Sequence, residues 1–152
     1  IDVGARGYGA MAATVGVGAL VGSLVIASLT EFHRRALLQA FMGVGFGVAL
    51  LLLGFSPTLF VAVVPLLVLG FCADAYSSLN NTMLMMHTDP KYQGRVMSVY
   101  LMTFAAMPLG AAPISALADI AGVRQTFVGM GVIVAGFIAA VALLYPRYRR
   151  IT

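Results

Sequence analysis

The sequence predicts an all-α membrane protein, on its composition and on the length of its apolar runs. Of the 152 residues, 61% are hydrophobic and only 9% are charged, and the mean hydropathy is +1.00. Soluble domains carry roughly 25% charged residues. Because a soluble fold of this size could not bury so much apolar surface, we expect the lipid bilayer to surround most of the chain. A helix crosses the hydrocarbon core with about 20 apolar residues, whereas a barrel strand needs about ten alternating ones, so the long continuous runs predict helices.

Five apolar runs are long enough to span a bilayer and together predict one transmembrane bundle over residues 1–152. They lie at about residues 8–29, 36–54, 59–84, 96–118 and 125–145.

The first two spans are rich in small residues. Gly18 and Gly22 are four positions apart, as are Gly43 and Gly47 in the second span. This spacing places two glycines on one face of a helix and lets two helix backbones approach closely in lipid. We therefore expect both pairs to lie at helix-packing contacts.

Prolines fall inside the third and fourth spans. Pro65 lies in the third, and Pro108 and Pro113 lie in the fourth with Gly110 between them. Proline lacks the backbone N–H that a helix interior uses, so it kinks or breaks a helix. The sequence predicts a bent fourth span, and the bend serves either packing or a gating motion. The fifth span contains no proline and precedes a basic tail.

The basic residues predict the orientation of the chain. If it crosses the membrane five times, one side carries seven of the nine Lys and Arg residues, and the other carries only Arg6 and Arg124. The side with more basic residues faces the cytoplasm. We expect a multi-pass protein of the plasma (inner) membrane, with its C-terminus cytoplasmic. The seven are Arg34, Arg35, Lys91, Arg95, Arg147, Arg149 and Arg150.

Asp74 is a carboxylate about midway along the third span, where a charged group is costly in lipid. On a helix it shares an arc of roughly 100° with Gly70, Ser77, Ser78 and Asn81. One interpretation is that this polar stripe lines a solute path in which Asp74 takes up and releases a proton. The other is that the stripe joins neighbouring helices through hydrogen bonds. The residues alone leave both open.

Other kinds of chemistry have little support. His33 and His87 lie in expected loops, and Cys72 is the single cysteine. No His, Cys and carboxylate residues have the spacing of metal ligands. No catalytic motif is present, and the few basic residues form no stripe of the kind that binds nucleic acid. We expect no enzyme, no cofactor, no metal site and no nucleic-acid partner.

Two loops resemble those of a known transporter family. "GALVGSLVIASLTEFHRRALL" resembles a helix and the cytoplasmic loop motif G-x-L-a-D-R-x-x-R-R of the major facilitator superfamily. Arg34 and Arg35 match the motif. Thr30 and Glu31 stand where the family has aspartate and arginine, which puts the charge contacts of this loop in question.

The second resemblance covers the segment that begins at "DPKYQGRVM". It is similar to the loop and penultimate helix of the exporter branch that includes the enterobactin exporter and multidrug efflux proteins. The matching positions are Asp89, Gly94, Arg95, Val96, Met97, Pro108 to Gly110 and Ala116 to Asp119.

The resemblance implies that the five spans correspond to helices 8–12 of a twelve-helix fold. Since the chain begins at Ile1 rather than at methionine, we expect it to be a fragment that lacks helices 1–7. The tenth helix, which carries Asp74, would contribute to the wall of a central cavity, and the eleventh would pack nearby.

The function implied is proton-coupled export, by alternating access, of a small amphipathic or lipophilic compound such as a drug or a siderophore. The partners would be the bilayer, helices 1–7, the solute and protons. The alternative is a membrane module that does not transport and that scaffolds or senses through helix–helix contacts.

Overall fold

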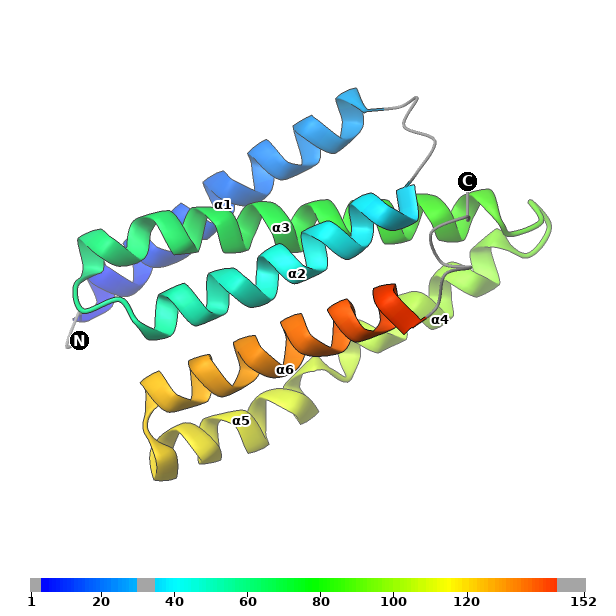
Figure 1. Ribbon diagram of the computed structural model, residues 1–152. Coiled ribbons are helices and arrows are strands. Elements are labelled where there is room, and N and C mark those ends of the chain that lie inside the picture. Colours follow the sequence, from blue (N-terminus) through cyan, green and yellow to red (C-terminus); the bar gives the residue numbers. More distant parts are fainter. Residues whose placement is uncertain (1–3, 30–34, 145–152) are drawn as a thin grey trace.

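The structure, a computed structural model, describes residues 4–29 and 35–144, which form a bundle of helices (Figure 1). In chain order they are α1 (Gly4–Ser28), α2 (Arg35–Gly54), α3 (Leu59–Met86), α4 (Gln93–Ala105), α5 (Met107–Ala121) and α6 (Val123–Leu144). Taking α4 and α5 together as Gln93–Ala121, five stretches of the described residues are long and apolar enough to cross a membrane. The protein is therefore an all-α, multi-pass membrane protein.

The helices alternate in direction, so their ends gather at two sides of the bundle. The ends of α1, α3 and α6 lie on the same side as the starts of α2 and α4 (Figure 1). The turn between α2 and α3 and the turn between α5 and α6 lie on the other side. Arg35, Lys91 and Arg95 thus lie at one end of the bundle, which we call the basic end, and Arg6 and Arg124 lie at the opposite end.

Helices α1 and α3 cross with their backbones in close contact. A Cβ atom at Gly18 would collide with the carbonyl oxygen of Leu67, and one at Gly22 would lie 2.5 Å from the carbonyl oxygen of Phe71. From the other side, Gly70 of α3 packs directly under the backbone of Val15. Only glycine fits at these three positions, so small residues determine where the two helices cross.

Helices α2 and α6 also pack closely at glycines, although they are far apart in the sequence. A Cβ atom at Gly47 would lie 2.7 Å from that of Ala135, and one at Gly43 would lie 2.6 Å from a methyl carbon of Ile138. Gly131 of α6 packs against the backbone of Gly47 in return. Both glycine pairs singled out in the sequence therefore lie at helix–helix contacts.

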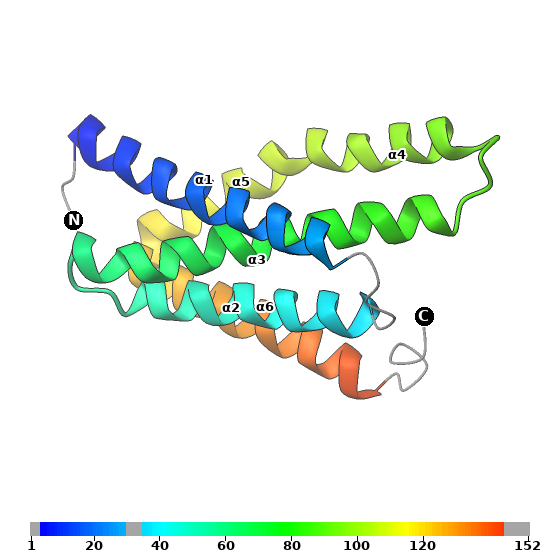
Figure 2. The same ribbon diagram turned by 90° about the horizontal axis from the view of Figure 1, so that it is seen from above.

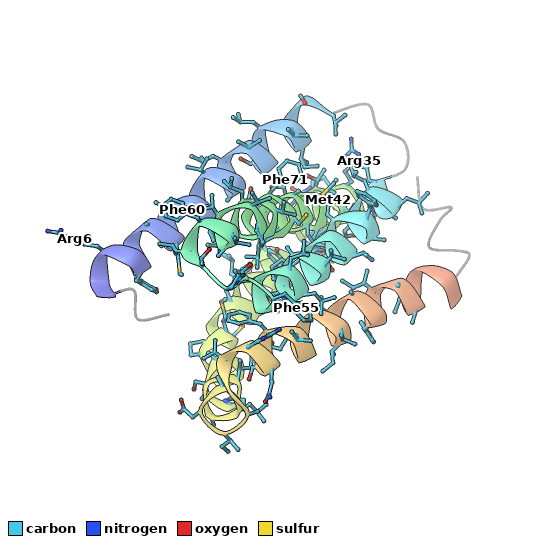
Figure 3. All side chains as sticks on the ribbon, turned by 60° about the vertical axis from the view of Figure 1, so that its left-hand side comes forward. Arg6, Arg35, Met42, Phe55, Phe60 and Phe71 are labelled. Carbon is cyan, nitrogen blue, oxygen red and sulfur yellow. The ribbon has the colours of Figure 1, made fainter. Side chains whose placement is uncertain are left out.

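The buried core lies between α2 and α3. Met42, Cys72, Ala75 and Leu79 form its centre, and Phe71 packs against it from the side. Figure 3 shows Phe71 between α1 and α3, and Met42 between α3 and α2. Helix α3 therefore packs against α1 on one face and against α2 on another.

The fourth span is broken, in agreement with the predicted bend. Helix α4 ends at Ala105 and α5 begins at Met107, with Ala106 in a turn between them. Pro108 lies at the start of α5, where its missing N–H interrupts the hydrogen-bond ladder that would join the two helices. By contrast, α3 continues through Pro65, and Pro113 lies within α5.

Neither α4 nor α5 buries a single residue. Viewed from above, α4 runs back along the last part of α3, while α5 continues behind α1 and α3 (Figure 2). Helix α5 packs against α6, and Gly122, at a φ of 90°, ends it. A φ in this range favours glycine, so the tight turn into α6 depends on that residue.

The α1–α3 crossing predicts that alanine substitutions at two nearby glycines differ sharply in their effect on stability. In the full-length protein, Gly18→Ala should lower the free energy of unfolding by about 1–3 kcal/mol, because the added methyl group overpacks the crossing. Gly16→Ala should have little effect, because a Cβ atom there meets nothing within 4 Å. Thermal unfolding of the purified protein in detergent measures both. Equal unfolding temperatures for the two variants would contradict the close crossing.

Candidate functional site

Asp74 lies about midway along α3 and is half-buried. One turn before it, Gly70 lies under α1, and nearly one turn after it, Ser77 contacts α4. Since each residue turns a helix by about 100°, Gly70 and Ser77 both lie to one side of Asp74 around α3, by roughly 40° and 60°, and Ser78 lies about 40° to the other side. No residue within 4–29 and 35–144 forms a hydrogen bond or ion pair with it.

Asp74 is also electrostatically isolated. The other charged residues that the structure describes lie within the first or last turn of a helix or in the loop after α3. Within the described residues, no opposite charge therefore lies beside this carboxylate.

Tyr100 of α4 reaches the same face. Its hydroxyl oxygen lies 3.5 Å from the hydroxyl oxygen of Ser77, and its ring packs edge-on against Phe104, with 5.4 Å between the ring centroids. The two aromatic side chains stand on α4 just before the break at Ala106. The sequence analysis missed Tyr100, since Ser77 is 23 residues away and the chain reverses direction between them.

Toward the basic end, Ser78 and Asn81 line an open groove of about 550 Å³. Thr82, Met85 and Met86 complete its lining. Thr82 donates its hydroxyl hydrogen to the carbonyl oxygen of Ser78, at 2.8 Å. The groove combines uncharged polar groups with flexible thioethers, a lining that adapts to differently shaped apolar groups.

The predicted stripe is therefore divided among three environments. Gly70 is covered by α1, Ser77 faces α4, and Ser78 and Asn81 are open to the groove, with Asp74 between them. Ser78 and Asn81 thus lie in the groove and Ser77 lies against a neighbouring helix, and the role of the stripe stays a prediction.

A second polar contact joins α2 to α3. Gln39, which is only 5% exposed, donates a hydrogen bond from Nε2 to Oδ1 of Asn80, at 3.4 Å. Asn80 lies off the stripe, so the carbonyl and amide groups of this pair connect helices rather than line the groove. A buried glutamine among apolar residues was the one signal that could have predicted it.

The loop residues serve partly structural purposes. Asp89 accepts a hydrogen bond at 2.9 Å from the backbone N–H of Lys91 and shapes the turn before α4. Gly94 and Arg95 are exposed on the first turn of α4. Arg35, at the start of α2 (Figure 3), donates from Nη1 to Sδ of Met86, at 2.7 Å, and so connects α2 to the rim of the groove. Arg34 lies outside the described residues.

The described residues hold no group of three His, Cys, Asp or Glu side chains that could bind a metal ion.

A family model described as "Major Facilitator Superfamily" matches residues 2–151. The chain belongs to the major facilitator superfamily.

One curated relative is the multidrug efflux pump Tap of Mycolicibacterium fortuitum. The two are 27% identical over 136 residues, which cover 89% of this chain and 33% of that protein. The chain thus spans about a third of the length of the relative it matches. No solved structure matches it.

Membership of the superfamily explains the resemblance of the loops around Arg35 and Arg95. Membership also agrees with the polar stripe on α3, which lies within an apolar helix long enough to cross a membrane.

The groove predicts that its lining is reachable by water-soluble reagents. In the full-length protein without its native cysteines, Asn81→Cys should react readily with a small thiol reagent, because Asn81 lines the open groove. Leu79→Cys, two residues away and only 4% exposed in the core, should react far more slowly. Mass spectrometry of the labelled protein measures both rates. Similar rates at the two positions would show that the groove is closed in the full-length protein.

Proposed function

We propose that this chain is part of a secondary active transporter that exports a small amphipathic or lipophilic compound in exchange for protons. The helices of the chain would form much of one of two bundles that rock around a site near the membrane midplane. In this proposal the five spans correspond to helices 8–12 of the superfamily's fold. The remaining bundle would supply the other wall of the site. The chain performs no covalent chemistry on the solute.

The observation that carries the proposal is Asp74, together with membership of the superfamily. An ionisable group within a membrane span is costly and is retained where it serves a solute or proton path. Asp74 is half-buried, has no partner among the described residues, and lies beside the groove at Ser78 and Asn81. The name of the mycobacterial relative supports export of a drug-like compound.

The same geometry suggests a sequence of events. Protonation of Asp74 neutralises the polar face of α3 and lowers the cost of closing apolar helices over it. Loss of the proton restores a charge that favours the open, hydrated arrangement. Alternating access then follows if the solute and the proton reach this face from opposite sides of the membrane.

The alternative of a membrane module that does not transport gains no support from the glycines. Such a module would present small-residue faces to partner helices. Here Gly18 and Gly22 are covered by α3, and Gly43 and Gly47 are covered by α6. Both faces are used inside the bundle.

For location, we propose the plasma (inner) membrane with the basic end in the cytoplasm, on the charge bias of the loops. A cysteine replacing Pro57, in the turn between α2 and α3, should then react with a membrane-impermeant thiol reagent on intact cells. One replacing Lys91 should react only after permeabilisation. The reverse pattern would invert the proposed orientation.

Asp74→Asn tests the function directly. Asparagine keeps the size and polarity of the side chain but cannot exchange a proton, so the variant should lose proton-driven efflux from vesicles that contain the full-length protein. Asp119→Asn removes an exposed carboxylate near the far end of α5 and should retain efflux.

The two parts of the proposal fail separately. If the wild-type protein moves no dye or drug under a proton gradient, proton-coupled export is wrong. If it does and Asp74→Asn transports equally well, export stands, and Asp74 is not the proton-coupling group.

A further inference from the structure

Helix α4 makes few contacts with the rest of the described residues, and its Tyr100 reaches α3 at Ser77, three residues after the carboxylate on which the proposed function depends. We propose that α4 is a movable wall in front of Asp74, which turns at Ala106 and is held closed by Tyr100 against Ser77. The inference rests on the proposed function, because it concerns access to Asp74, but it is tested without measuring transport.

The hinge follows from the break in the backbone. An uninterrupted helix would resist bending along its whole length, whereas here α4 stops at Ala105 and α5 begins at Met107. Pro108 cannot donate the hydrogen bond that would close the ladder across the break. Only the turn-type bond from the N–H of Leu109 to the carbonyl oxygen of Ala106, at 3.0 Å, spans this point. A change of a few backbone angles at Ala106 would therefore reorient α4.

The two parts of the broken span are anchored differently. Helix α5 packs against α6, which itself packs against α2. Helix α4 buries no residue, and beyond its own loop it is joined to α3 by two side-chain contacts. One is at its start, where Nε2 of Gln93 donates to the carbonyl oxygen of Met85 at 3.3 Å. The other is the contact between Tyr100 and Ser77, so among the described residues α4 is the more weakly held part of the span.

Tyr100 is placed to decide whether Asp74 is covered. Ser77 follows Asp74 by three residues, so the hydroxyl group of Tyr100 lies about one helical turn, or roughly 5 Å along the axis, from the carboxylate position. The ring of Phe104 backs the ring of Tyr100 on the side nearer the break. At 3.5 Å the two hydroxyl groups make a long, weak contact, which suits a closure that must open repeatedly.

The first experiment measures access to position 74. In the full-length protein without its native cysteines, Asp74→Cys is labelled with a small water-soluble thiol reagent, alone and combined with Tyr100→Phe. The added change removes the hydroxyl group but keeps the ring, so labelling should become several-fold faster. Tyr76→Phe is the matched control, because Tyr76 lies on another face of α3, beside Gly43 and Ile138. It should leave the rate unchanged.

The second experiment stiffens the hinge. Pro108→Ala restores the missing N–H and lets α4 and α5 join as one helix, so labelling at position 74 should change several-fold from the rate with Pro108 present. Pro113→Ala restores an N–H inside an unbroken helix and should have little effect.

The outcomes are decisive in each direction. Faster labelling in Tyr100→Phe, with unchanged labelling in Tyr76→Phe, supports the movable wall. Equal labelling rates in Tyr100→Phe and its parent overturn it, whether or not the protein transports. If Pro108→Ala does not fold, the Tyr100 comparison decides alone, since it removes a single hydroxyl oxygen atom and keeps the ring.

Discussion

The close backbone contact between α1 and α3 is the interaction on which the rest of the arrangement depends. Gly18, Gly22 and Gly70 let the two helices cross at a distance that side chains would prevent. In lipid there is little hydrophobic force between helices, so such packing is a main source of their association. The crossing at Gly70 fixes the position of α3 against α1, and the next turn of α3 follows directly from it. That turn carries Asp74, and the groove lies beyond it.

The sequence predicted the helices well, because the physical constraint behind them is strong. A chain in lipid must satisfy its backbone hydrogen bonds internally, so a long apolar run has helix as its main solution. The predicted spans at 36–54 and 59–84 differ from α2 and α3 by at most two residues at either end. The bend in the fourth span was also predictable from Pro108, although the sequence did not show that Pro65 and Pro113 would leave their helices unbroken.

The site was less predictable, since it depends on contacts between distant residues. Helical periodicity placed Asp74, Ser78 and Asn81 on one side of α3, and Ser78 and Asn81 line the same groove. It could not show that Gly70 is covered by α1, nor that Tyr100 returns to Ser77 after a reversal of the chain. Nor could it pair Gln39 with Asn80, which are 41 positions apart. Periodicity describes one helix at a time, whereas these features belong to pairs of helices.

The contact between α2 and α6 has a consequence for how the protein is made. Gly47 packs against Ala135, a residue synthesised nearly ninety positions later. At roughly 5–20 residues per second, the ribosome needs several seconds to supply that partner. During this interval the glycine face of α2 is uncovered in the bilayer, while α3 is already available to hold the helix through the core around Met42. Within this stretch of chain, α1, α2 and α3 can therefore pack together first, and the contact of α2 with α6 forms only when α6 arrives.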